Sequence, residues 1–302
     1  MEFRRATKIV ATLGPASSEP QLLEQMIREG VNVVRLNFSH GSAQDHIDRA
    51  AMVRAAAQRA GREVAIMADL QGPKIRIASF ADGSIRLQPG DPFTIDAGLD
   101  SHLGDQSRVG TDYPALAGEL QTGNVVLLDD GRIQLCVEQV IDERIETRVL
   151  VGGTLSSRKG INVLGGGLSA PALTDKDKAD ILTARLLEAD YIAVSFPRSA
   201  ADLEEARTLI RASGSRAAIV AKVERAEVVA SVAAMDELIH AADLIMVARG
   251  DLGVEIGDAR LPGVQKRLSG RQIRAKIDAG NRLEEYLLGI RVMKAYNLLG
   301  DR

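Results

Sequence analysis

The sequence of 302 residues contains no tryptophan and one cysteine, and aromatic residues make up only 3% of it. The single cysteine, Cys136, excludes an intramolecular disulfide framework and a cysteine-rich metal site. No apolar run is long enough to cross a bilayer, and the N-terminal MEFRRATKIV lacks the apolar core of a signal peptide. The sequence therefore predicts a soluble, cytoplasmic protein with no membrane partner.

An excess of charge of one sign is also missing. The formal net charge is -3, acidic and basic residues are mixed along the chain, and no basic tract occurs. This pattern argues against a protein that binds nucleic acid or a membrane surface. Apolar residues make up 45% of the chain, which is enough for a substantial core in one large domain or two smaller ones.

Strands and helices alternate in two stretches of the sequence. Apolar runs predict strands over residues 7–13, 31–38, 64–70, 191–196, 218–223 and 244–248, and helices are predicted over 21–28, 43–60, 174–188 and 200–212. Ser18 is expected to cap the first helix, and Thr174 with Asp177 forms a capping-box-like pair at the third. Near-continuous apolar strands separated by helices indicate a parallel sheet or barrel.

Between the third and fourth predicted strands the alternation stops. From residue 77 to 166 the sequence contains no convincing helix, and short runs separated by glycine, aspartate and proline turns predict strands over 84–87, 92–95, 125–128, 133–140 and 146–151. We call residues 77–166 the inserted domain, because they interrupt the α/β pattern with a small all-β unit. The glycines at 165–167 are expected to form its exit hinge.

Charged residues follow two of the predicted strands directly. Lys222 and Glu224 are two positions apart, so in an extended segment they point the same way, and Asp251 comes after the next strand. Chemistry in parallel α/β proteins lies at the carboxyl ends of strands. Two carboxylates there suit Mg²⁺, and a neighbouring lysine suits a phosphate. A plain salt-bridge cluster at the end of a barrel is the alternative for any one of these residues.

Longer motifs give a more specific hypothesis. TKIVATLGPAS, VVRLNFSHGS, ADLQGPKIR, LLDDGRI, SSRKGINVLGGG, LSAPALTDKDKADI, YIAVSFPRSAADL, IVAKVERAE and MVARGDLGVEIG occur in this order over residues 7–268. They closely resemble segments of pyruvate kinases. The resemblance implies a (β/α)8 barrel with an inserted lid domain, in a homo-oligomer that transfers phosphate from phosphoenolpyruvate to ADP, giving pyruvate and ATP at the last step of glycolysis.

The resemblance also implies roles for individual residues. Arg35 and Lys222 are expected to be catalytic and to bind substrate, Lys222 by offsetting the charge on the transferring phosphoryl group. The remaining assignments are Gly250 and Asp251 for substrate, Glu224 and Asp251 for Mg²⁺, and Arg76, Lys159 and His40 for the nucleotide. Because Lys159 lies in the inserted domain, closure of that domain is expected to complete the site.

The monovalent-cation pocket of the family matches Asn37, Ser39, Asp69 and Leu70. Potassium-dependent members have Thr after this Asp and Glu four positions later, whereas this chain has Leu70 and Lys74. The resemblance therefore implies that K⁺ is not required, since the ammonium of Lys74 can supply the positive charge. An ordinary solvated lysine is the alternative.

After Leu268 the resemblance ends. The seventh strand with its ITATQM-like motif, the eighth strand and the regulatory domain are not found, and residues 269–302 predict one or two amphipathic helices interrupted near Gly280. We therefore expect an incomplete (β/α)8 barrel of the TIM type. Three hypotheses follow: a phosphotransferase whose activity is impaired by truncation, a non-catalytic remnant that binds phosphoenolpyruvate or nucleotide, and a Mg²⁺-dependent lyase or aldolase.

Overall fold

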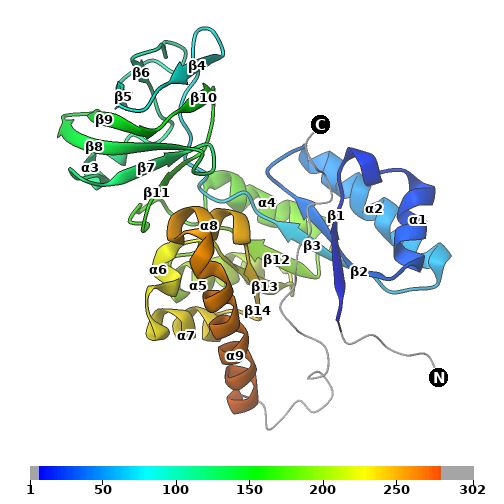
Figure 1. The fold of residues 1–302 in the computed structure, drawn as a ribbon. Helices are drawn as coiled ribbons and strands as arrows, with labels where there is room; N and C mark the ends of the chain where they lie inside the picture. Colours follow the sequence, from blue (N-terminus) through cyan, green and yellow to red (C-terminus); the bar gives the residue numbers. More distant parts are fainter. Residues whose placement is uncertain (1–6, 280–302) are drawn as a thin grey trace.

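A parallel, curved sheet forms the centre of the molecule in the computed structural model, which describes residues 7–279 (Figure 1). Its six strands are ordered β1-β2-β3-β12-β13-β14. The bounds are β1 Ile9–Thr12, β2 Val31–Asn37, β3 Ala65–Asp69, β12 Tyr191–Val194, β13 Ala218–Val223 and β14 Leu244–Val247. Within the described residues β1 and β14 each pair with one strand only, so the sheet is open at both edges and confirms the predicted incomplete (β/α)8 barrel.

Helices lie between the strands of this sheet and after its last strand, β14. They are α1 (Pro20–Arg28), α2 (Ala43–Ala60), α4 (Asp175–Leu186), α5 (Ala200–Ala212), α6 (Ala226–Ala230), α7 (Val232–Ala241), α8 (Arg249–Ile256) and α9 (Leu261–Ala279), with 3-10 turns η1 (Pro15–Ser17) and η2 (Asp258–Arg260). None of the helices described is long and apolar enough to cross a membrane.

Two helix starts test the capping predictions. The Thr174 side chain accepts from the amide of Asp177 while the Asp177 carboxylate accepts from the amide of Thr174, so the capping box of α4 is confirmed. The prediction for Ser18 was wrong. Glu19 is the N-cap of α1, which begins at Pro20, and the Ser18 hydroxyl donates to the carbonyl of Gly14 at 2.7 Å instead.

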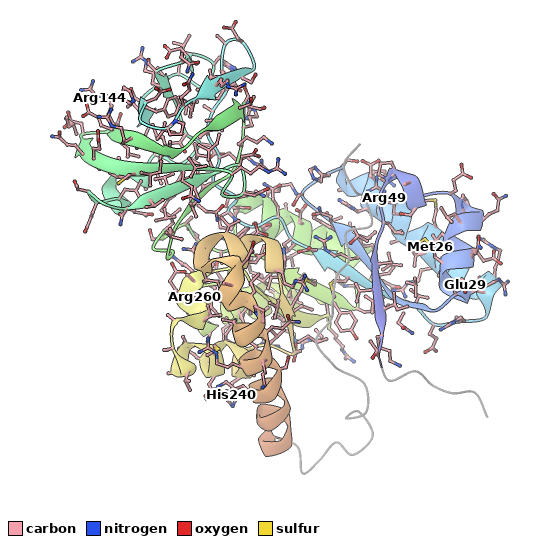
Figure 2. All side chains as sticks on the ribbon, viewed as in Figure 1. Met26, Glu29, Arg49, Arg144, His240 and Arg260 are labelled. Atoms are coloured by element: carbon pink, nitrogen blue, oxygen red, sulfur yellow. The ribbon has the colours of Figure 1, made fainter. Side chains whose placement is uncertain are left out.

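The inserted domain is a β unit with its own core, antiparallel except for the parallel pair β5–β6, and it projects from one end of the open barrel (Figure 1). Its elements are β4 (Ser84–Leu87), β5 (Pro92–Asp96), β6 (Arg108–Val109), α3 (Leu116–Glu119), β7 (Val125–Leu128), β8 (Ile133–Ile141), β9 (Arg144–Val151), β10 (Gly153–Ser156) and β11 (Ile161–Val163). The one-turn helix α3 corrects the expectation of no helix here, because four residues are too short to show helical periodicity. Arg144 marks the far end of this domain in Figure 2.

Side chains of the sheet divide into two layers. Residues such as Val34 and Ala68 face the helices and join the main core, whereas Val33, Met67 and Val220 face inward and form a small apolar cluster of their own. This alternation follows from the two-residue period of a strand. It fixes which residues reach the inner mouth of the barrel.

The last described helix crosses the predicted end of the family resemblance. Helix α9 runs continuously from Leu261 to Ala279, past residue 268. The predicted interruption near Gly280 and the rest of the tail lie outside the described residues.

Candidate active site

One layer of polar side chains lies directly above the inner apolar cluster. On four adjacent strands, the residue two positions beyond an inward apolar residue is polar: Arg35 follows Val33, Asp69 follows Met67, Ser195 follows Ala193 and Lys222 follows Val220. Because alternate residues of a strand share a face, all four polar side chains point inward at the carboxyl ends of β2, β3, β12 and β13. These four residues, which we call the charged layer, therefore lie on top of the inner apolar cluster.

Lys222 is the centre of this layer. Its ammonium lies 2.9 Å from Oε1 of Glu224, 3.2 Å from Oδ1 of Asp69 and 2.7 Å from the Ser195 hydroxyl. Its side chain is 12% exposed, and those of both carboxylates are 1% exposed. Burial lowers the pKa of Lys222, but the charges of Glu224 and Asp69 outweigh it and raise the pKa above its usual value. The lysine is therefore held as a cation.

Arg35 lies on the other side of Asp69. Its Nε donates to Oδ2 of Asp69 at 2.5 Å, and Nη1 donates to the hydroxyl of Thr12 at 2.9 Å. The Arg35 side chain remains 17% exposed. A guanidinium has five N–H groups, so this anchoring leaves donors for a planar or tetrahedral anion at the mouth.

Glu224 is buried next to a second carboxylate. Burial raises the pKa of Glu224, and the charge of Asp251 raises it further against the opposing effect of Lys222. Its Oε2 accepts from the amide of Phe196 at 2.7 Å. Like charges confined together in this way are relieved by a cation.

These residues fit Mg²⁺ in ligand type. Mg²⁺ is bound through one or two carboxylates plus water and substrate oxygens, rather than by a full protein cage. Within the part of the chain that the structure describes, no group of three or more His, Cys, Asp or Glu side chains could hold a metal. Glu224 and Asp251 would therefore supply two oxygen ligands, and their mutual repulsion is what a divalent ion would neutralise.

Asp251 lies in the first turn of α8, not at a strand end as its position after β14 had predicted. It opens onto a cleft of about 640 Å³ between α8 and the β7–β8 turn of the inserted domain. Gly250 and Lys74 line the same cleft, together with Arg132 and Asp258. The cleft therefore separates Gly250 and Asp251 from the inserted domain.

The entry to the inserted domain packs against the charged layer. Gly72 has a φ of +68°, and a Cβ built on it would lie 2.7 Å from Cβ of Ser195. Its amide donates to Asp177 at 3.0 Å. A glycine is required here because any side chain would collide with the β12 end of the site.

The two residues assigned to nucleotide phosphates lie together, Arg76 at the entry of the inserted domain and Lys159 within it. Arg76 forms a bridge with Gly160, and the amide of Ile77 donates to the carbonyl of Lys159 at 2.9 Å. The Lys159 ammonium pairs with Asp129 at 2.7 Å. The structure therefore brings Arg76 and Lys159 together.

The residues of the expected monovalent-cation pocket follow β2 and β3. Asn37 and Asp69 are register partners on these strands, and Oδ1 of Asn37 accepts from the amide of Ser39 at 3.1 Å. Leu70 is 1% exposed and supplies its carbonyl to Ser195 at 2.7 Å. His40, assigned to the nucleotide, is exposed in the turn that follows.

Two buried polar residues of this region were not singled out from the sequence. Ser195 is 1% exposed and bonds Lys222, and its place two residues after Ala193 was the available signal. Glu255 is 5% exposed, and its carboxylate accepts from the amide of Ala226 at 2.8 Å and from Asn162 at 3.4 Å. Burial raises the pKa of Glu255 to about 6. No sequence pattern singled out Glu255, unlike Asp251, the other acidic residue of α8.

The exit from the inserted domain is held by charged side chains. Glu227 accepts from the amide of Gly167 and Arg225 donates to the carbonyl of Leu168, both at 2.6 Å. Arg198 donates to the carbonyl of Ser169, also at 2.6 Å. The segment predicted as a glycine hinge is thus tied to the barrel by three charged residues.

Comparison with known proteins gives this arrangement a family. A model of the pyruvate kinase barrel domain matches residues 4–284. The chain belongs to the pyruvate kinase family. It is 55% identical over 286 residues to a pyruvate kinase of Haemophilus influenzae and to pyruvate kinase II of Salmonella typhimurium. A pyruvate kinase of Geobacillus stearothermophilus is 44% identical over 269 residues, which cover 88% of this chain and 45% of that protein.

The match is unequal in length. It covers 94% of this chain but 60% of each of the two relatives at 55% identity. The pyruvate kinase family match also extends past residue 268, where the motifs read from the sequence end.

Proposed function

We propose that this chain binds phosphoenolpyruvate and ADP and transfers the phosphoryl group between them, as a cytoplasmic enzyme of glycolysis. The observation that carries the proposal is the buried contact of Lys222 with both Asp69 and Glu224, beside the anchored guanidinium of Arg35. Two fixed cations beside the neighbouring carboxylates of Glu224 and Asp251 suit a phosphoryl group that arrives with a divalent metal.

Each residue then has a defined task. Arg35 would hold the substrate phosphate with the N–H groups that Asp69 and Thr12 leave over. Lys222 would stabilise the charge on the transferring group, and Gly250 with Asp251 would meet the substrate carboxylate. Mg²⁺, when bound by Glu224 and Asp251, supplies charge neutralisation. Arg76, Lys159 and His40 would contact the nucleotide as residues 77–166 close over the cleft.

Two finer points belong to the same proposal. Lys74 lines the cleft with Asp251, and its ammonium would replace K⁺ near Asn37, Ser39, Asp69 and Leu70. A homo-oligomer is expected from the family. The competing proposal is a non-catalytic protein that binds the same ligands.

A coupled assay of pyruvate formation, together with calorimetry of phosphoenolpyruvate binding with and without Mg²⁺, tests these alternatives. Glu224→Gln and Asp251→Asn should each abolish the Mg²⁺-dependent part of binding, while Lys222→Met should keep it and reduce turnover by about 10²–10³-fold, as loss of one electrostatic stabiliser does. Asp258→Asn, in the same cleft, is the matched control and should behave as wild type.

The outcomes separate the proposals. Mg²⁺-dependent binding without pyruvate formation supports the non-catalytic alternative. Unchanged binding in both carboxylate variants would remove Glu224 and Asp251 from the metal site, and unchanged turnover in Lys222→Met would remove that lysine from the reaction.

A further inference from the structure

Lys222 has hydrogen-bond acceptors on three sides, and they differ in kind. Two are the carboxylates of Asp69 and Glu224, and the third is the hydroxyl of Ser195 at 2.7 Å. Ser195 follows β12, the strand between β3 and β13, so it stands between the two carboxylate-bearing strands. An ammonium has three N–H groups, which these acceptors match in number.

The direction of the Ser195 hydrogen bonds is fixed by its neighbours. The carbonyl of Leu70 can only accept, so the Ser195 hydroxyl donates its proton to that carbonyl at 2.7 Å. An ammonium can only donate, so the oxygen lone pairs of Ser195 accept from Lys222. The hydroxyl oxygen therefore acts as an acceptor for the Lys222 ammonium. Ser195 is 1% exposed, so water does not compete for this hydrogen bond.

The three acceptors are not equivalent once cations arrive. Under the proposed function, Glu224 gives oxygen to a divalent ion, and Asp69 already pairs with Arg35. Each carboxylate is then shared with another cation and binds Lys222 less strongly. Ser195 is the remaining acceptor, and its partner Leu70 is a backbone carbonyl within the same buried layer.

We infer that Ser195 is a positioning residue, which anchors the Lys222 ammonium at the mouth of the barrel when Glu224 binds a divalent cation. The inference rests on the proposed function for the assignment of Glu224. Ser195 touches no substrate in this role; it acts through Lys222.

The test uses the full chain with ¹⁵N-labelled lysine at one fixed pH, and follows the ammonium signal of Lys222, assigned by its loss in Lys222→Met. Wild type should show a protected ammonium signal both without cation and with Mg²⁺ alone. Ser195→Ala should lose that signal in Mg²⁺, because Glu224 is then shared with the ion and Asp69 with Arg35. If turnover is present, the rate constant kcat should fall about 10- to 100-fold, as expected for one hydrogen bond to a charged group, with KM for phosphoenolpyruvate nearly unchanged.

The matched control is Ser215→Ala. Ser215 is also buried and its hydroxyl accepts one backbone amide, that of Ala217 at 3.1 Å, but it lies before β13 at the opposite end of that strand. This variant should keep the Lys222 signal. Ser195→Thr retains the hydroxyl, so a positioning role predicts recovery of the signal, whereas a packing role predicts none. This variant also decides the matter if the alanine variant does not fold.

Each result separates this inference from the proposed function. A Lys222 signal that survives Ser195→Ala in Mg²⁺, that is missing from wild type, or that is lost equally in Ser215→Ala would overturn the positioning role. A signal that depends on Ser195 in a chain without phosphoryl transfer would leave the positioning role intact and count against the proposed activity.

Discussion

Lys74 places a positive charge in the cleft that also exposes Asp251. It follows the turn at Gly72, whose contact with Ser195 ties the entry of the inserted domain to the charged layer. Asp69 already forms ion pairs with Arg35 and Lys222. A further resident cation would therefore leave little negative charge for K⁺ to neutralise. We therefore expect phosphoenolpyruvate affinity to be nearly equal in Na⁺, K⁺ and tetramethylammonium at matched ionic strength.

Exchange of two residues should create a K⁺ requirement. Lys74→Glu combined with Leu70→Thr removes the ammonium and adds a carboxylate and a hydroxyl, so phosphoenolpyruvate should then bind about tenfold or more tightly in K⁺ than in tetramethylammonium, as measured by calorimetry. Lys178→Glu makes the same charge change on the exposed face of α4 and should have no such effect. If phosphoenolpyruvate binding by the unmodified chain depends on K⁺, Lys74 is an ordinary solvated lysine and does not replace the ion.

The residues of the charged layer could be foreseen to different degrees. Lys222 and Glu224 were predicted to lie side by side from their two-residue spacing, and the structure joins them at 2.9 Å. Their closeness to Arg35 and Asp69 came from the family resemblance, because strand order in space is not written in a local pattern. Ser195 was missed because a serine after an apolar run has many uses, and only its neighbours show which one applies.

Glu255 connects three elements that are far apart in the sequence. Its carboxylate binds the start of α6 through Ala226 and binds β11 through Asn162, while its own carbonyl accepts from Gly165 at 3.0 Å. Burial raises its pKa from 4.5 to about 6. The folded chain thus binds this proton more tightly than the unfolded chain, so the stabilisation is full below about pH 4.5 and is lost as pH rises through 6.

Glu255→Gln should remove this pH dependence. The amide keeps an oxygen for Ala226 and carries no charge, so we expect the variant to gain about 2 kcal/mol over wild type between pH 4.5 and pH 7.5. Urea denaturation at several pH values in this range measures the difference. The exposed Glu204→Gln is the control and should follow wild type. A constant difference between Glu255→Gln and wild type across the range would show that Glu255 does not titrate on unfolding.

Repeated contacts at the start of strands explain why the α/β part forms without an obvious sequence repeat. Arg54 of α2 bonds a carbonyl before β12 and lies 3.4 Å from Asp190, whose carboxylate accepts from an amide of β3. Arg207 of α5 bonds a carbonyl before β14 and lies 3.4 Å from Asp243, whose carboxylate accepts from an amide of β13. In each of two strand–helix units, one arginine and one aspartate make the same set of contacts. Two residues in each unit are too few to appear as a sequence repeat.

The molecule contains two large apolar cores rather than one. The main core lies between the parallel sheet and its helices, and the other lies within the inserted domain. The two parts are connected by the entry turn at Gly72, by the charged side chains that hold the exit segment 165–169 and by the contact of Glu255 with Asn162. Polar connections of this kind are weaker than a shared apolar core, so the two parts are expected to open separately.

Ligand binding should therefore stabilise the two parts unequally. Arg35, Asp69, Lys222 and Glu224 all belong to the barrel, and only the nucleotide contacts are assigned to the inserted domain. Phosphoenolpyruvate with Mg²⁺ at 100 times its Kd should stabilise the barrel by about 2.7 kcal/mol. Hydrogen exchange of the most protected amides of β3 and β13 should then slow about 100-fold, whereas those of β8 and β9 should change little.

Glu224→Gln with the same ligands is the control for this experiment, because it should keep the exchange rates of the ligand-free chain in both parts. Adding ADP should extend the protection to the inserted domain, since Lys159 lies there and Arg76 at its entry, and closure would couple the two cores through the ligand. If phosphoenolpyruvate and Mg²⁺ alone slow hydrogen exchange equally in the barrel and the inserted domain, the charged contacts of segment 165–169 already make the two parts one cooperative unit. In that case domain closure would not be the step that admits the nucleotide.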